Sequence, residues 1–266
     1  MRNITNIATV VLLMATVARP LLAESTSLDS VVGKTSQEVS EFLDQFSDVK
    51  CTEQVSQAKL SKSGRTEVRE NSTFDYFVLL QGDNDELTLS ESRLAEKKPG
   101  NPGKTTSLLL TNGFSTLFLI FHPYYRNGFR FDGLADEVID GQRLKRVHFT
   151  HIPGTRTPAA LAVRGREYPL ELAGTAWLDP ATGQVARIEA SLANDMRDVG
   201  LVAMSVQVDY APVSLPGWAQ AYRFPTVATV DVESLRQRWR NVHRFTKYQR
   251  FMVETQQKVA DRGVKN

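Results

Sequence analysis

The sequence predicts a mainly β protein: a curled antiparallel meander, or half-barrel, of about nine to ten strands capped by two helices. Three observations lead to this fold class. Apolar and polar residues alternate with period two over most of the chain, short turn-forming sequences separate these runs, and only two segments interrupt the pattern. A twisted sheet with this many strands curls rather than staying flat, so we expect a concave apolar face that the two segments cover.

The amino-terminal residues 1–23 have the layout of a secretory signal peptide. Arg2 precedes an apolar stretch from Ile7 to Ala18, and the small residue Ala23 follows where signal peptidase cleaves. The apolar stretch is too short to span a bilayer. We therefore expect cleavage after Ala23, a mature chain of residues 24–266 that forms a single domain, and a periplasmic or secreted location.

Charge and cysteine content exclude some classes of protein. The chain has 32 Lys and Arg against 30 Asp and Glu, and loss of Arg2 and Arg19 with the signal makes the two counts equal. A nucleic-acid-binding protein needs a surplus of basic residues, so we do not expect this protein to bind nucleic acid. Cys51 is the only cysteine, which rules out an intramolecular disulfide. Its position between Val49 and Val55 predicts a buried inert side chain, and the alternative is a reactive or intermolecular thiol.

One amphipathic helix precedes the strands. Thr35 and Glu38 have the spacing of a capping box, and apolar residues follow on one face at helical intervals up to Phe46. The pattern predicts a helix over Thr35–Phe46 that buries Val39 and Phe42.

Strands follow with apolar residues at every second position. The clearest runs are Thr66–Leu80, Leu144–Ile152, Val185–Ala193, Leu201–Tyr210 and Phe224–Glu233. Turn sequences lie between runs of this kind, at Ser63–Gly64, Gly82–Asn84, Asp140–Gly141 and Asp179–Gly183. Short turns between alternating runs indicate antiparallel neighbours.

Ser107–Phe121 is the most hydrophobic stretch of the mature chain. We expect a buried helix that begins near Asn112 and stops at His122-Pro123, after a loop at Lys97–Lys104. Two interpretations remain open for this segment. It is either a plain core helix that plugs the concave face, or a helix that lines or gates an apolar cavity.

Motifs of catalysis and metal binding are missing from the sequence. His148 and His151 are three residues apart in a predicted strand, so they point to opposite faces, with His151 inside. There is no H-E-x-x-H, C-x-x-C or phosphate-binding loop, and Gly113–Leu117 lacks the closing glycine of a nucleophile elbow. We expect no enzyme activity, no cofactor and no metal site.

The carboxy-terminal strand pattern carries four arginines on one face: Arg236, Arg238, Arg240 and Arg244. This arginine strip has two interpretations. It is either a contact surface for an anionic membrane surface or an envelope protein, or a solvated outer face of an ordinary strand.

The segment Thr175–Ile188 resembles a hairpin of the outer-membrane lipoprotein-sorting proteins, the periplasmic lipoprotein carriers and their relatives. The shared pattern is an apolar-Trp-apolar-Asp-x-x-Thr-Gly turn, here with Trp177, Asp179, Thr182 and Gly183. The resemblance implies a curled half-barrel, capped by helices, around an apolar cavity that accepts acyl chains. The chain departs from the family in its length and its arginine-rich end, and no ligand residue can be transferred by motif.

The sequence therefore predicts a non-enzymatic periplasmic protein that binds a lipid or a lipoprotein acyl chain, as a carrier or sensor in the cell envelope. The parity of a position in its strand, which decides the face of the sheet, and the size of the side chain suggest the residues that line the cavity: Phe74, Tyr76, Val78, Phe114, Leu117, Phe118, Phe121, Trp177 and Met204. The alternative is an envelope protein-interaction module with a fully packed core, which contacts its partner through the arginine strip.

Overall fold

A computed structural model describes residues 27–83, 86–95, 113–163 and 166–250. The predicted signal peptide, the loop at Lys97–Lys104 and residues 107–112 lie outside the described residues. In chain order the elements are α1 (Leu28–Phe46), β1 (Val49–Leu60), β2 (Thr66–Asp83), β3 (Glu86–Ala95), the 3₁₀ helix η1 (Leu117–Phe121), α2 (Pro123–Arg126), β4 (Phe129–Gly133), β5 (Glu137–Ile139), β6 (Gln142–His151), β7 (Ala160–Val163), β8 (Arg166–Pro169), β9 (Leu172–Leu178), β10 (Val185–Leu192), the 3₁₀ helix η2 (Arg197–Val199), β11 (Leu201–Val213), β12 (Tyr222–Ser234) and β13 (Arg238–Arg250).

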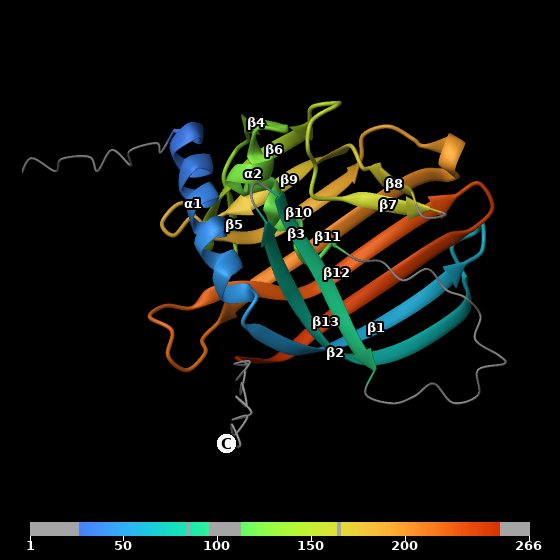
Figure 1. The fold of residues 1–266 in the computed structure, drawn as a ribbon. Coiled ribbons are helices and arrows are strands. Elements are labelled where there is room, and N and C mark those ends of the chain that lie inside the picture. Colours follow the sequence, from blue (N-terminus) through green and yellow to red (C-terminus); the bar gives the residue numbers. More distant parts are fainter. Residues whose placement is uncertain (1–26, 84–85, 96–112, 164–165, 251–266) are drawn as a thin grey trace, which may run out of the picture.

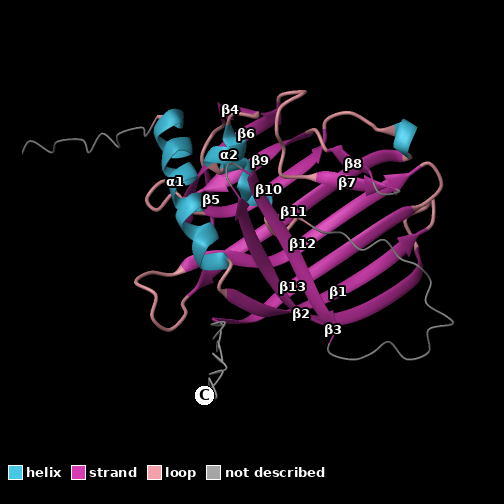
Figure 2. Ribbon diagram, viewed as in Figure 1, coloured by secondary structure: helices cyan, strands magenta, loops and turns pink. Residues whose placement is uncertain are grey.

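One large antiparallel sheet dominates the molecule (Figure 2). Its strand order is β3-β2-β1-β13-β12-β11-β10-β9-β6-β4, with β5 paired to β6, and β7 and β8 form a separate hairpin. The sheet curls so that β3 runs across the direction of β12 and β13, while α1 lies along one side of it (Figure 1). The predicted mainly β fold, a curled antiparallel meander with helices against it, is confirmed.

The large sheet has 11 strands, close to the predicted number of about nine to ten. The predicted runs correspond to β2, β6, β10, β11 and β12. The additional strands include β4 with five residues and β5 with three. Strands this short contain too few alternations to be recognised by period.

Helix α1 begins at Leu28, about two turns before the predicted start at Thr35. Ser27 is its N-cap, and the Ser27 side chain accepts a hydrogen bond from Ser30 N at 3.3 Å. Thr35 is fully buried inside the helix and caps nothing. Val31 and Val32 extend the buried apolar stripe toward the N-terminus, so the stripe, rather than the capping-box spacing, marks where the helix begins.

The predicted buried helix near Asn112 is wrong in type. The described part of this segment is the short 3₁₀ helix η1, whose five residues are all buried, followed by α2. His122 separates the two helices with an extended backbone (ψ 140°), because the residue before a proline avoids helical geometry. His122 Nδ1 then accepts from Tyr124 N at 3.2 Å and caps α2. Among the described residues, no helix is long and apolar enough to cross a membrane.

Alternation places one face of each strand in a common core. Val49, Cys51 and Val55 of β1 are buried together, as the sequence predicts. Burial also raises the pKa of the Cys51 thiol to about 12, which favours the protonated thiol at neutral pH.

Candidate functional site

Most of the residues predicted to line a cavity do lie together on the concave side of the sheet. Tyr76, Val78, Leu117, Phe118, Phe121 and Met204 are buried in one hydrophobic cluster. Phe114 is half-buried and packs against that cluster, and Phe74 is half-buried on β2. Whether these residues contact a ligand stays a prediction.

Trp177 is the exception, because it lies on the opposite face of the sheet. Its neighbours on β9, Ala176 and Leu178, point into the core, whereas Trp177 stacks between two guanidinium groups. Arg146 Cζ and Arg187 Cζ are 5.6 and 5.8 Å from the indole ring. Successive side chains of a strand point to opposite faces, so Trp177 cannot share the inner face with Ala176 and Leu178. Its expected place in a cavity is therefore corrected.

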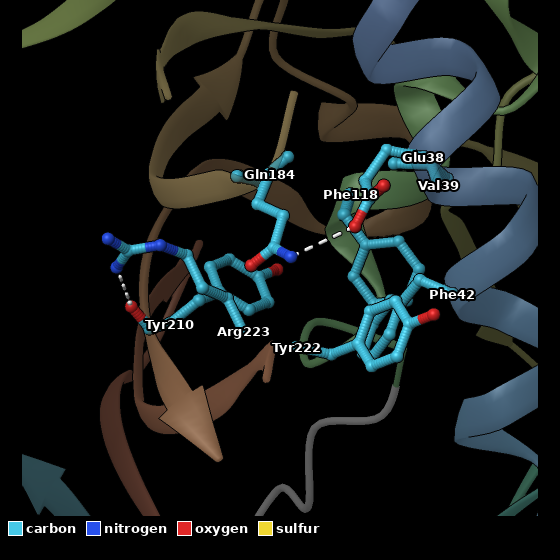
Figure 3. A pocket seen from close by; sticks show the side chains of 9 residues that line it. Glu38, Val39, Phe42, Phe118, Gln184, Tyr210, Tyr222 and Arg223 are labelled. Atoms are coloured by element: carbon cyan, nitrogen blue, oxygen red, sulfur yellow. Dashed lines mark hydrogen bonds between the residues drawn. The ribbon is translucent and has the colours of Figure 1, made fainter. Parts of the chain in front are cut away.

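An aromatic crevice lies between α1 and the concave face of the sheet (Figure 3). Its lining residues are Glu38, Val39, Phe42, Phe118, Gln184, Val185, Tyr210, Tyr222 and Arg223. The Phe42 ring lies 5.2 Å from the Phe118 ring and 5.8 Å from the Tyr222 ring, between centroids. The free volume is about 20 Å³, which is space for one water molecule and not for an acyl chain. The crevice is closed in this structure.

Polar contacts join α1 to the β9–β10 hairpin, whose turn is Asp179–Gly183. Gln184 Nε2 donates to Glu38 Oε1 at 3.0 Å, as Figure 3 shows, and also to the carbonyl of Ala221 at 3.1 Å. Lys34 Nζ donates to the carbonyl of Ala181. Burial raises the pKa of Glu38, because the carboxylate loses water at the edge of the apolar crevice. The turn Asp179–Gly183 is therefore a docking point for α1.

A second, ionic region lies on the concave face of β1, β3 and β13. Glu53 is fully buried, and it accepts two hydrogen bonds from Arg93, from Nε at 2.5 Å and from Nη2 at 2.8 Å. His243 Nδ1 donates to Glu53 Oε1 at 2.8 Å. Burial alone would raise the pKa of Glu53, but the hydrogen bonds from His243 and Arg93 outweigh it and hold this pKa below 4.5.

The ionic region extends to the segment that leads into η1. Glu91 is 3.2 Å from Arg93 Nη2, and Glu91 Oε1 accepts from Gly113 N at 2.9 Å and from Ser115 Oγ at 3.0 Å. Tyr76 and Ser115 share a hydrogen bond of 2.6 Å between their hydroxyls. These contacts fix the segment before η1 to the sheet.

Sequence reasoning missed the ionic region, although one signal for it was present. Glu53 shares its parity with Val49, Cys51 and Val55, so it is an acid in a row of inward-facing apolar residues. A buried carboxylate requires a partner, but nothing in the local sequence identifies Arg93 or His243 as that partner.

The arginine strip is exposed, as expected, but part of its charge is neutralised. Arg240 forms hydrogen bonds of 2.7 and 3.0 Å with the carboxylate of Asp231, and Arg238 lies 3.4 Å from Glu233. Both acids lie on β12, beside β13. Pairing across strands cannot be seen in the run of arginines itself.

Metal-binding groups do not gather in the described parts of the chain, where no three His, Cys, Asp or Glu side chains could hold one ion. His151 is buried and His148 half-buried on alternate faces of β6, as their spacing predicts. His151 Nε2 lies 3.3 Å from the carbonyl of Thr155.

No protein-family model and no curated protein matches this sequence. Solved structures with a similar fold include a DUF1329 family protein from Desulfovibrio piger ATCC 29098, at 10% identity and a TM-score of 0.44, covering 85% of this chain and 93% of that one. They also include a chain described as an outer membrane lipoprotein-sorting protein domain from Vibrio parahaemolyticus, at 11% identity and a TM-score of 0.44, covering 85% and 95%.

Proposed function

We propose that this protein is a non-enzymatic carrier or sensor of the cell envelope that binds a lipid or lipoprotein acyl chain between helix α1 and the concave face of the sheet. The observation that carries the proposal is the aromatic crevice under α1. It is apolar within, polar at its rim, and bounded on one side by a single helix. The amino-terminal sequence supports the periplasmic location.

Binding requires α1 to move, because the crevice is closed. Burial of apolar surface contributes about 0.8 kcal/mol per methylene, so roughly a dozen methylenes supply about 10 kcal/mol. Micromolar binding corresponds to about 8 kcal/mol, which leaves little to offset the displacement of α1. We expect weak to micromolar affinity for a single chain.

The test uses dodecanol, a neutral probe that isolates apolar burial, with the mature protein. We expect saturable binding and slower hydrogen exchange in α1 and η1, while the exchange of β10 and β11 stays unchanged. Before the probe is added, η1 should exchange faster than these strands. Organic extracts of protein purified from its host should contain lipid.

A matched pair of variants on α1 separates loss of the site from loss of stability. Val39 and Val31 are both buried, but Val39 lines the crevice and Val31 does not. We expect Val39→Ser to weaken dodecanol binding about fivefold or more, and Val31→Ser to leave it within about twofold. Equal effects, or exchange of η1 as slow as that of β10 with and without dodecanol, would contradict the proposal.

The tight packing of the crevice also keeps the second function open, a protein-interaction module with a packed core. Its docking surface would be the arginine strip, of which Arg236 and Arg244 are exposed without a carboxylate within 4.0 Å among the described residues. A pull-down from an envelope fraction is compared between the wild type and a triple variant with Arg236, Arg238 and Arg240 changed to Ser. Equal recovery of partners by the two proteins would count against this function.

A further inference from the structure

Arg223 lies at the edge of the aromatic crevice with neutral partners only. It is half-buried on β12, next to Tyr222. Its Nη2 donates to Gln142 Oε1 at 2.6 Å, and its Nη1 donates to the carbonyl of Tyr210 at 3.2 Å. Within the described chain, no carboxylate oxygen lies within 4.0 Å of this guanidinium.

Other half-buried arginines of the sheet have a different environment. Arg93 binds Glu53, Arg187 Nε donates to Asp209 at 2.6 Å, and Arg146 Nε lies 3.5 Å from Glu137. A cation that is partly removed from water is stabilised by an opposite charge, which these three arginines have from the protein itself. Arg223 lacks that compensation, and an anion from outside would supply it.

The position of Arg223 connects two hollows of the surface. One is the aromatic crevice, and the other is a pocket of about 370 Å³ whose wall includes Ile139, Leu144 and Pro212. Tyr210 and Arg223 line both. The second pocket, whose wall also includes Arg187 and Asp209, is large enough for a carboxylate or phosphate group with its water. It shares Tyr210 and Arg223 with a crevice suited to a hydrocarbon chain.

The acidic groups near this junction are occupied or exposed. Asp209 is paired with Arg187, and it also accepts from Gln207 Nε2 at 3.1 Å. Asp140 lies in the exposed turn between β5 and β6, where water and salt screen its charge. On the crevice side, Glu38 is held by Gln184. None of these acids faces the guanidinium of Arg223 at ion-pair distance.

We propose that Arg223 binds the anionic headgroup, a carboxylate or a phosphate, of the amphiphile whose chain enters the aromatic crevice. This inference rests on the proposed acyl-chain binding and narrows its ligand class to acidic amphiphiles. A guanidinium presents parallel N–H donors that match the oxygens of both headgroups. The hydrogen bond to Gln142, which also lines the second pocket, holds the guanidinium of Arg223 at that pocket. The N–H groups of Arg223 that make no hydrogen bond to Gln142 or Tyr210 are left for the ligand.

The experiment compares four probes with the same alkyl chain: dodecanoate, dodecyl phosphate, dodecyltrimethylammonium and dodecanol. The three ionic probes are used below their critical micelle concentrations, and dodecanol is used below its solubility limit. We expect the wild type to bind at least one anion about tenfold more tightly than dodecanol, the effect of one charge-assisted hydrogen bond, and the cation more weakly than dodecanol. A preference for only one of the two anions identifies the headgroup as carboxylate or phosphate.

Variants assign the preference to this residue. Arg223→Gln should remove the tenfold anion preference, measured as the ratio of anion affinity to dodecanol affinity in the same variant, and Arg223→Lys should keep part of that ratio. Arg146→Gln is the control, because it removes a half-buried arginine that lines neither hollow. Thermal unfolding confirms that each variant is folded.

Two failures are distinguishable. If dodecanol binds but the anions bind no more tightly, or Arg223→Gln keeps the preference, the headgroup inference is overturned while the proposed function stands. If no probe binds, dodecanol included, the proposed function is overturned and this inference falls with it.

Discussion

The Phe42 ring on α1 packs against the rings of Phe118 and Phe224 below it. On the same concave face, a second group forms a buried ionic chain: Glu53, Arg93 and His243. Apolar packing has no fixed direction, so rings can separate and repack around a guest with a moderate change in free energy. A buried ion pair permits no such exchange, because each group left without its partner costs several kcal/mol. The aromatic region is therefore suited to opening, and the ionic region to holding the sheet and the segment before η1 in place.

The largest effect should come from the centre of the aromatic region. Phe118 is 1% exposed, and its ring contacts those of Phe42, Phe46 and Tyr210 at centroid distances of 5.2, 5.9 and 6.0 Å. We expect Phe118→Ala to lower the free energy of unfolding by about 4 kcal/mol in urea denaturation. Phe114→Ala, in the same segment but half-buried, is the control and should cost about 1 kcal/mol. A cost for Phe118→Ala no larger than the control would show that this region is not the core.

The ionic region should respond almost as strongly to the loss of one partner. Glu53→Ala leaves Arg93 and His243 buried without their shared carboxylate, and we expect a loss of about 3 kcal/mol in the free energy of unfolding. The exposed pair of Asp231 and Arg240 is the comparison, and Asp231→Ala should cost less than about 1 kcal/mol. Equal losses in urea denaturation would refute the distinction between the buried and the exposed pair.

The smallest expected effect is on the pH dependence of stability, which should have opposite signs for one carboxylate in each region. The pKa of Glu53 is lowered, so its contribution to stability is complete above about pH 4.5 and is lost as the pH falls through its folded pKa. The pKa of Glu38 is raised, so its contribution has the opposite sign, and stability falls as the pH rises from about 4.5 through its folded pKa.

Urea midpoints measured between about pH 3 and pH 7 test both signs. Glu53→Gln should flatten the acid side of the curve, and Glu38→Gln should raise stability at neutral pH by less than about 1 kcal/mol, because Gln still accepts from Gln184. The assignment of the two carboxylates is wrong if Glu38→Gln lowers the neutral midpoint or Glu53→Gln steepens the acid loss.

The same contrast explains what the sequence could reveal. Period-two runs predict β2, β6, β10, β11 and β12, because the alternation of buried and exposed residues is local. The inner positions of Tyr76, Val78 and Met204 follow from parity in the same way. Parity and bulk together fail for Trp177: its side chain is buried, but it lies between Ala176 and Leu178 on β9 and so points to the opposite face of the sheet from theirs.

What could not be predicted depends on contacts between distant parts of the chain. The partners of Glu53 come from β3 and β13, and the acids that neutralise Arg238 and Arg240 come from β12. The small volume of the crevice depends on how α1 and η1 pack together against the sheet. Neither register nor packing is encoded in the pattern of a single segment.

The strand order has a consequence for when the protein can fold. β1 lies between β2 and β13, and the hydrogen bond between Glu53 and His243 joins residues 190 positions apart. During synthesis from the amino terminus, β1, β2 and β3 can pair with one another early. The free edge of β1 then has no partner strand until β13 is made, near the end of the chain. Pairing over such a separation is slow, and an unpaired edge attracts other chains in the meantime. Folding of the complete sheet therefore waits for nearly the whole chain, and truncation before residue 238 would leave two sheets where the protein has one.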